Sequence, residues 1–392
     1  MKNFRFGDSI YSVRSFATLI VLSAWLCPFN PAISAPNCPV NFRNAEARHL
    51  RNTAEPSKSP FIFHSGEALE NITYKIKNDT FTLDDYLNRF CVTGLLILKE
   101  DRIVYQKYFQ DRKDTDALLS ASMSKTILAM LYGIAIDERK IALDEKVSSI
   151  LPDFNDSAFA PATVEDLLRM SSGVSLLNSH DKDSDSDNRA TNPLISPQQN
   201  VFEYLKNKKE RVADPGKIFA YNGAQTAMLA ALLSARVGGS ITTYLESRLW
   251  QPMGAEASGY WIKNWNGEEG AQGQFYATLR DYGKLGYLMM NQGRIGGKQI
   301  IPADWIAKMT ELRHDKPQRK TTPPFYGLHV WIPQAANGRS FFWGTNGQFI
   351  FVDPVARVVI VHTGNSPHTT YHGIAHVFPL RNAIVNYLAK KP

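Results

Sequence analysis

The segment Ser120–Leu128 (SASMSKTIL) places three serines at alternate positions and a lysine directly after the last of them. A serine hydroxyl becomes an effective nucleophile only when a neighbouring group removes its proton. On a helix, Ser122 and Lys125 would share one face because they are three residues apart. Ser124 would point to another face, and Ser120 would lie outside the helix. The spacing predicts Ser122 as the nucleophile, with Lys125 either stabilising the alkoxide or accepting its proton, since burial can lower a lysine pKa.

This S-x-x-K pattern is short, and a helix-capping serine beside a solvated lysine would also explain it. The G-x-S-x-G signature of α/β-hydrolases is absent. The adjoining run Thr126–Ile136 (TILAMLYGIAI) is apolar nearly all round and predicts a buried helix. A lysine that opens a buried helix favours the chemical interpretation. The helix N-terminus would also favour negative charge there, and the N–H of Ser122 could bind an oxyanion.

The surrounding elements indicate how these residues are positioned. Runs of β-forming residues predict a hairpin at 92–98 and 103–109, and further strands at 326–332, 348–353 and 358–363. Amphipathic or apolar periodicity predicts helices at 163–170, 224–236, 277–290 and 374–388. Strands therefore lie at both ends of the chain and helices in the middle. This order predicts an α+β fold (an α/β sandwich), with an antiparallel sheet built from both termini, flanking helices and a mainly helical insert at about 150–255.

The N-terminus has the pattern of a secretory signal. Basic residues precede the apolar run Phe16–Leu26, which is too short to span a bilayer, and small residues follow it. We expect a signal peptide at 1–35 and export to the periplasm or beyond, with an uncleaved membrane anchor as the alternative. Residues 36–90 are expected to form an N-terminal extension packed on the outside of a hydrolase domain at 91–390. In an oxidising compartment Cys38 and Cys91 either pair or stay as two free thiols.

Composition limits the classes of partner. The 392 residues include 44% hydrophobic residues and carry a formal charge of +7. A weakly basic chain without a basic tract argues against nucleic acid, and a small-molecule substrate is expected. The sequence does not predict an oligomeric state.

Two polar patterns have the residue types of metal sites. Acidic residues alternate at Asp181, Asp183, Asp185 and Asp187, but the loop lacks the glycine and glutamate of a calcium loop, so a solvated loop is favoured. Histidines recur every four residues at His368, His372 and His376, and could bind zinc on one helix face, but packing and capping roles are favoured. We expect neither a metal nor a cofactor.

Residues 90–390 resemble the serine β-lactamase and penicillin-recognising superfamily. The resemblance is greatest to its class C-like branch, with family VIII esterases and 6-aminohexanoate-dimer hydrolases. An ordered set of segments carries it: SASMSKTILAMLYGIAIDE, TVEDLLRMSSGV, DPGKIFAYNGAQTAML, LWQPMGAEASGYW, ATLRDYGKLGYLM and WGTNGQFIFVDPVARVVIVHT. Such a set is more specific than any single motif.

The resemblance implies roles for individual residues. Ser122 would be the acylated nucleophile, Lys125 its partner, and Tyr221 the tyrosine of a Y-x-N motif, acting as general base with a pKa lowered by the lysine. The N–H of Gln348 would be the second oxyanion donor, and Gly347 would let substrate approach the backbone closely.

Two positions depart from the family pattern. Gly223 stands where Y-x-N has asparagine, so Asn222 would have to substitute from the neighbouring position. The K-T-G element, expected on an edge strand, reads Thr345-Asn346-Gly347 and lacks a cation for a substrate carboxylate.

The implied function is hydrolysis of an amide or ester through an acyl-enzyme, as in 6-aminohexanoate-dimer hydrolases and carboxylesterases. The alternatives are a β-lactamase or D,D-peptidase, and a non-catalytic sensor of the penicillin-binding type.

Overall fold

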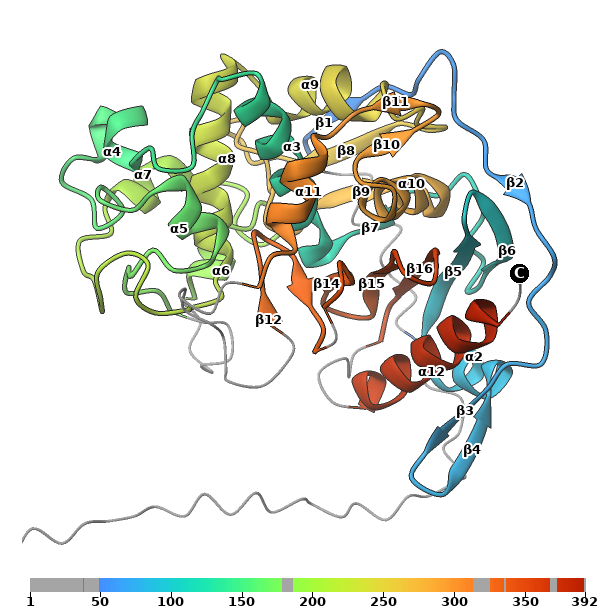
Figure 1. The fold of residues 1–392 in the computed structure, drawn as a ribbon. Coiled ribbons are helices and arrows are strands. Elements are labelled where there is room, and N and C mark those ends of the chain that lie inside the picture. The colour runs from blue at the N-terminus through green and yellow to red at the C-terminus, as the bar shows by residue number, and fades with distance from the viewer. Residues whose placement is uncertain are drawn as a thin grey trace, which may run out of the picture. The chain divides into compact units, whose positions relative to one another are not determined.

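The computed structural model describes residues 38, 49–177, 186–312, 325–334, 336–366 and 372–390 (Figure 1). Its largest sheet has eight strands in the order β12-β13-β14-β15-β16-β5-β6-β2. These are β12 (Phe325–Tyr326), β13 (Trp331–Ile332), β14 (Ser340–Gly344), β15 (Gln348–Asp353), β16 (Val358–Gly364), β5 (Val92–Lys99), β6 (Arg102–Tyr108) and β2 (His64–Ser65). All neighbours are antiparallel except β2 and β6. The predicted sheet from both termini is therefore confirmed.

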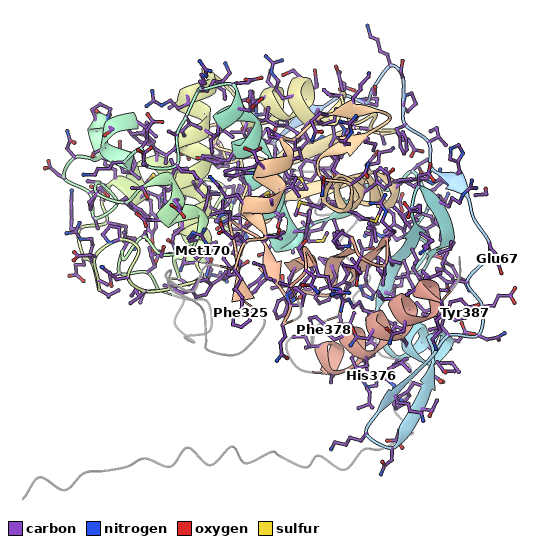
Figure 2. All side chains as sticks on the ribbon, viewed as in Figure 1. Glu67, Met170, Phe325, His376, Phe378 and Tyr387 are labelled. Carbon is purple, nitrogen blue, oxygen red and sulfur yellow. A yellow bond between two sulfur atoms is a disulfide. The ribbon has the colours of Figure 1, made fainter. Side chains whose placement is uncertain are left out.

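The two faces of this sheet bury different helices. Successive side chains of a strand point to opposite faces. Leu96 and Leu98 belong to one apolar cluster together with α10 (Leu279–Met290). Their neighbours Leu95 and Ile97 belong to a second cluster, with α2 (Leu83–Arg89) and α12 (His372–Ala389). On α12, Phe378 (labelled in Figure 2) contacts aromatic rings of β14 and β15.

A second sheet of four strands has the order β1-β8-β9-β7. It consists of β1 (Arg51–Ala54), β8 (Gly259–Ile262), β9 (Phe275–Ala277) and β7 (Leu118–Leu119). Two small hairpins complete the strands: β3 (Thr73–Ile76) with β4 (Asp79–Thr82), and β10 (Arg294–Ile295) with β11 (Lys298–Gln299). Residues 49–82, assigned from the sequence to an outer extension, thus supply β1 and β2 to the two larger sheets.

Helices dominate the middle of the chain, as predicted. They are η1 (Ala121–Met123), α3 (Ser124–Asp137), α4 (Val147–Ile150), η2 (Pro152–Phe154), α5 (Val164–Leu168), α6 (Asp187–Ala190), α7 (Val201–Lys206), α8 (Gly223–Val237), α9 (Ile241–Leu245), η3 (Glu246–Trp250) and, later in the chain, α11 (Ala303–Met309). Twelve of the fourteen residues of α3, from Ser124 to Ala135, are buried, which confirms the predicted core helix. A capping box between Thr163 and Asp166 starts α5, and Gly238, at φ 74°, ends α8.

One local prediction was wrong. Residues 326–332 form two short strands separated by a turn in which His329 has φ 53°. The helix predicted at 277–290 is confirmed as α10. It begins at Leu279 rather than at Ala277, which ends β9, because the Thr278 side chain caps the helix by accepting a hydrogen bond from the Asp281 N–H. Strand β14 was not predicted.

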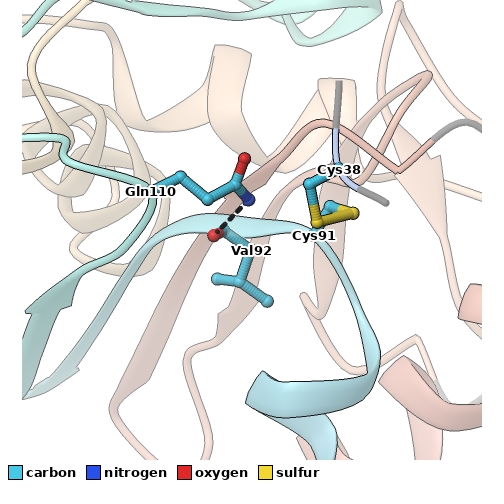
Figure 3. Close-up of a disulfide and its surroundings, with 4 residues drawn as sticks. All are labelled: Cys38, Cys91, Val92 and Gln110. Atoms are coloured by element: carbon cyan, nitrogen blue, oxygen red, sulfur yellow. Dashed lines mark hydrogen bonds between the residues drawn. A yellow bond between two sulfur atoms is a disulfide. The ribbon is translucent and has the colours of Figure 1, made fainter. Parts of the chain in front are cut away.

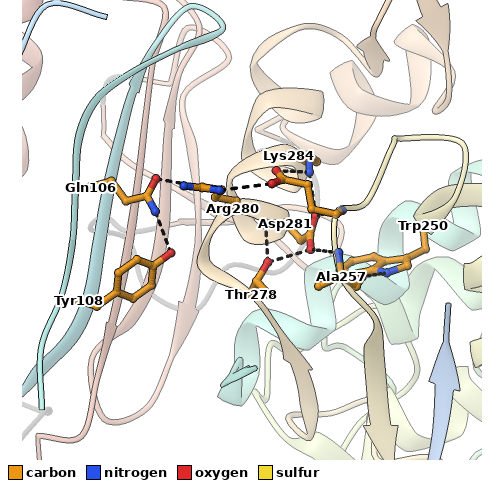
Figure 4. A network of polar contacts seen from close by, with 9 residues as sticks. Gln106, Tyr108, Trp250, Ala257, Thr278, Arg280, Asp281 and Lys284 are labelled. Carbon is orange, nitrogen blue, oxygen red and sulfur yellow. Dashed lines mark hydrogen bonds and ion pairs between the residues drawn. The ribbon is translucent and has the colours of Figure 1, made fainter. Parts of the chain in front are cut away.

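A buried polar network joins α10 to its surroundings (Figure 4). The Lys284 ammonium is fully buried and lies 2.7 Å from a Glu256 oxygen and 2.9 Å from an Asp281 oxygen. Asp281 also accepts hydrogen bonds from the Glu256 and Ala257 N–H groups. Arg280 extends the network to Gln106 of β6. Each buried charge therefore has an opposite charge beside it, as burial requires.

A disulfide joins Cys38 to Cys91 at the start of β5, with the two Cα atoms 5.5 Å apart (Figure 3). Of the two open alternatives for these cysteines, the structure shows pairing. Within the described residues no single helix is long and apolar enough to cross a bilayer. Only α8 followed by Ile241–Trp250 meets the criteria of length and composition, as a pair bent by 71°.

Candidate active site

The three serines of the opening segment have different surroundings. Ser122 lies in η1, directly before α3, and its Oγ is 3.0 Å from Lys125 Nζ. The Ser120 hydroxyl donates to the carbonyl of Ala121. The Ser124 hydroxyl donates to the Ala271 carbonyl at 2.6 Å and accepts from the Trp261 indole. Ser122 is half-buried, whereas Ser120 and Ser124 are buried. Of the three serines, Ser122 is therefore the one that is both accessible and within hydrogen-bond distance of Lys125.

The backbone at the nucleophile turn is unusual. Ala121, the residue before Ser122, has φ 43°, in the left-handed region that costs an L-residue about 1–2 kcal/mol. Gly344 of β14 lies against this turn, because a Cβ there would be 2.5 Å from the Ser120 carbonyl oxygen. Gly273 lies against it as well, with Ala121 and Ser122 backbone atoms within 4 Å of its would-be Cβ. These contacts hold the strained turn in place.

Lys125 is buried, with 4% of its surface exposed. Its Nζ also donates to the carbonyl of Gln272 at 2.5 Å. Burial lowers the pKa of Lys125 from 10.5 to about 7. A large fraction of the lysine is therefore an uncharged amine at neutral pH, which can accept the proton of Ser122.

Tyr221 lies just before α8 and faces the lysine. The Lys125 Nζ is 5.3 Å from the centroid of its ring. Tyr326 and Trp331, from β12 and β13, pack against the ring at centroid distances of 5.8 and 5.4 Å. The structure thus brings the three residues expected to be catalytic together in one place.

Asn222 is the N-cap of α8. Its Oδ1 accepts from the Ala224 N–H at 2.9 Å, and its Nδ2 donates to the Leu177 carbonyl at 3.0 Å. These bonds assign a structural role to Asn222. That Asn222 also substitutes for the asparagine of Y-x-N stays a prediction.

Two other amide side chains occupy the space at Gly223. A Cβ on Gly223 would lie 1.8 Å from Gln272 Oε1 and 2.7 Å from Asn188 Oδ1. The Gly223 N–H donates to Asn188 Oδ1 at 2.6 Å. Sequence reasoning missed Asn188 and Gln272, since they are polar residues on separate segments with no motif of their own.

The segment Thr345–Gly347 is a hairpin turn between β14 and β15. The expectation that it lies on an edge strand was wrong, because β15 is flanked by β14 and β16. Strands β14 and β15 both lie against η1, which places the turn beside the nucleophile. Thr345 is exposed, and Asn346 and Gly347 have φ 63° and 90°. The Gln348 side chain donates to the Gly364 carbonyl at 2.6 Å and so points toward β16.

The candidate metal-binding patterns fall partly outside the described residues. Asp181, Asp183, Asp185 and His368 lie there, as does the side chain of His372. Asp187 is fully buried and pairs with Lys208 at 2.5 Å. His376 bonds to the Tyr74 hydroxyl at 2.8 Å and packs against Phe81 and Phe90, the packing role favoured from the sequence. The described part of the chain holds no group of three potential metal ligands.

Known proteins share this arrangement of elements. A sequence model of the Beta-lactamase family matches residues 92–377. The 6-aminohexanoate-dimer hydrolase of Paenarthrobacter ureafaciens is 22% identical over 312 residues, which cover 74% of this chain and 78% of that protein.

Solved structures agree in fold. The "Putative 6-aminohexanoate-dimer hydrolase from Bacillus anthracis" superposes with a TM-score of 0.80 at 21% identity, covering 88% of this chain and 93% of that one. A family VIII carboxylesterase superposes with a TM-score of 0.57 at 18% identity, covering 74% and 91%. The chain belongs to the Beta-lactamase family and is a serine hydrolase of that superfamily.

Proposed function

We propose that the protein cleaves an amide or ester bond of a small molecule through an acyl-enzyme on Ser122. The observation that carries the proposal is the Ser122–Lys125 pair, with Oγ and Nζ 3.0 Å apart and the pKa of the buried lysine lowered to about 7. Sequence similarity to a 6-aminohexanoate-dimer hydrolase supports linear amides, and structural similarity to a carboxylesterase supports short esters.

In acylation, the Ser122 Oγ attacks the carbonyl carbon while its proton passes to the Lys125 amine. The aromatic packing around Tyr221 holds its ring beside the lysine, and in this mechanism its phenol would exchange a proton with Lys125. The developing oxyanion would be held by the N–H groups of Ser122 and Gln348. The amine or alcohol leaves with a proton from this pair. Water then attacks the ester, gives up a proton to the same groups, and releases the acid and the free Ser122 hydroxyl.

The residues near the site favour some substrates over others. Thr345, at the position where penicillin-recognising relatives carry a cation, is uncharged, and the neighbouring Asn346 and Gly347 are too. A neutral group adjoining the scissile bond therefore fits better than a carboxylate.

Labelling with a fluorophosphonate probe tests the nucleophile. We expect the probe to label the wild type on Ser122 and to leave Ser122→Ala unlabelled. A substrate panel of linear 6-aminohexanoate amides, short p-nitrophenyl esters, a chromogenic cephalosporin and D-alanyl-D-alanine peptides tests the class. We expect turnover in the first two groups. Turnover of the panel by Ser122→Ala at the wild-type rate would refute the proposal.

We further propose that the protein acts outside the cytoplasm. The Cys38–Cys91 disulfide supports this, because such bonds persist in oxidising compartments. The signal-like N-terminus, outside the described residues, is the second support. Fractionation of cells that produce the full chain, with and without residues 1–35, tests it. Retention of the full chain in the cytoplasm with both thiols reduced would contradict it.

A further inference from the structure

A buried histidine lies directly beneath the Thr345–Gly347 turn and has no role in the reaction described above. His362 is on β16, with 4% of its surface exposed, and its register partner on β15 is Phe349. Its Nδ1 is 2.6 Å from the Gly347 carbonyl oxygen, and its Nε2 is 3.0 Å from the Tyr86 hydroxyl.

These two partners fix the protonation of the imidazole. A carbonyl oxygen only accepts hydrogen bonds, so Nδ1 must carry a proton and donate. Burial lowers the pKa of His362 to about 4, so the ring is neutral at neutral pH and Nε2 must accept from the Tyr86 hydroxyl. A directed chain results: Tyr86 O–H to His362 Nε2, then His362 Nδ1–H to the Gly347 carbonyl.

The Gly347 carbonyl belongs to the same peptide unit as the Gln348 N–H. Because a peptide unit is planar, fixing the direction of the carbonyl also fixes the direction of the N–H. A hydrogen bond to the carbonyl also polarises the N–H at the other end of the unit and strengthens it as a donor.

The orientation of this peptide needs such support. Asn346 has φ 63° and Gly347 has φ 90°, conformations that an unsupported turn would readily leave. On the far side, the Gln348 side chain donates to the Gly364 carbonyl and accepts from the Gly364 N–H. Tyr86 is itself buried on α2, where its ring packs against Phe90.

We infer that His362 is a positioning residue for the oxyanion site: it holds the Gly347–Gln348 peptide so that the Gln348 N–H faces the carbonyl oxygen of the substrate. The inference rests on the proposed acyl-enzyme mechanism and adds a residue that the family motifs do not contain.

A set of substitutions separates this role from simple core packing. His362→Asn keeps an N–H donor at the place of Nδ1, whereas His362→Leu keeps the bulk and removes the donor. His362→Asn alone would leave the Tyr86 hydroxyl without its hydrogen-bond acceptor. The double variant Tyr86→Phe/His362→Asn therefore removes that hydroxyl as well. If the leucine variant does not fold, His362→Gln, whose amide lies toward the Nε2 side, takes its place with the same expectation.

We expect His362→Leu to lower kcat on a p-nitrophenyl ester by about 10- to 100-fold with little change in KM. Complete loss of one oxyanion donor costs about 10²–10³, and this variant only loosens the orientation of the donor, so the loss should be smaller. His362→Asn and the double variant should retain kcat to within about fivefold. Packing alone predicts instead that kcat follows the melting temperature in all variants, whether or not the donor is present.

The infrared band of the acyl-enzyme carbonyl gives a direct readout, because its frequency falls with stronger hydrogen bonding and does not depend on the fraction of protein that is folded. We expect the band to move to higher frequency in His362→Leu and to stay near the wild-type value in His362→Asn. An unshifted band in His362→Leu, or equal loss of kcat in both single variants, would overturn the inference alone. A wild type that forms no acyl-enzyme would overturn the proposed function, and the inference with it.

Discussion

The lowered pKa of Lys125 predicts how activity depends on pH. The fall from 10.5 to about 7 corresponds to about 5 kcal/mol in favour of the amine over the ammonium ion. Since only the amine can take the proton of Ser122, kcat/KM should rise with pH through an apparent pKa near 7. Between pH 6 and pH 8 the amine fraction, and with it the rate, should increase about tenfold.

Other buried groups near the site do not explain such a transition. Burial lowers the pKa of His329 to about 3 and that of His362 to about 4, so both rings are neutral throughout this range. His329 is moreover held by the Leu168 carbonyl and the Thr226 hydroxyl.

The assay is the pH dependence of kcat/KM for a p-nitrophenyl ester, measured for the wild type and Lys125→Arg. Arginine stays charged and cannot accept a proton, so we expect a loss of about 10²–10⁴ and no rise near pH 7. Lys140→Arg, at an exposed position just after α3, is the matched control and should behave as the wild type. A flat wild-type profile between pH 6 and pH 8, or the same rise in Lys125→Arg, would refute the assignment.

Three further predictions concern contacts that stabilise the fold. Gly223→Ala places a Cβ 1.8 Å from Gln272 Oε1, so we expect the free energy of unfolding in urea to fall by about 1–3 kcal/mol and kcat/KM to fall at least tenfold. Gly239→Ala, where a Cβ has open space, is the control. Unchanged stability and activity of Gly223→Ala would contradict the contact. Lys284→Met leaves Asp281 and Glu256 without their buried cation, so we expect the free energy of unfolding in urea to fall by about 3–5 kcal/mol. The control Lys298→Met, at an exposed position, should show no measurable change. Equal stability of the two variants would show that the network does not contribute. The Cys38–Cys91 bond joins residues 53 apart in the sequence, so its reduction should lower the free energy of unfolding by about 2–4 kcal/mol. Reductant should have no effect on the double variant Cys38→Ser/Cys91→Ser. A wild-type melting temperature that is the same with and without reductant would show that the cross-link contributes nothing.

The parts of the fold that the sequence predicted are those with strong local signals. The hairpin β5–β6, the buried helix α3, the capped helix α5 and the glycine-ended helix α8 were each expected from periodicity, turns or caps. The two-residue strands β2, β7, β10 and β11 were not, and neither was β14, since such short elements form through their pairing partners rather than through their own residues.

The candidate site divides in the same way. Ser122, Lys125 and Tyr221 stand in recognisable patterns, and the structure brings them together. Asn188, Gln272 and His362 make contacts between segments far apart in the chain, so neither spacing nor composition reveals them. Glycines at 223 and 344 are explained only by the atoms that a side chain there would meet.

The most direct test of the central claim is to trap the acyl-enzyme. The protein is mixed with p-nitrophenyl acetate, quenched in acid during turnover, and digested for mass spectrometry. We predict that a single acetyl group is found on Ser122 of the wild type and none in Ser122→Ala, with turnover lost in the variant. An acetyl group on another residue, together with undiminished turnover by Ser122→Ala, would contradict the account.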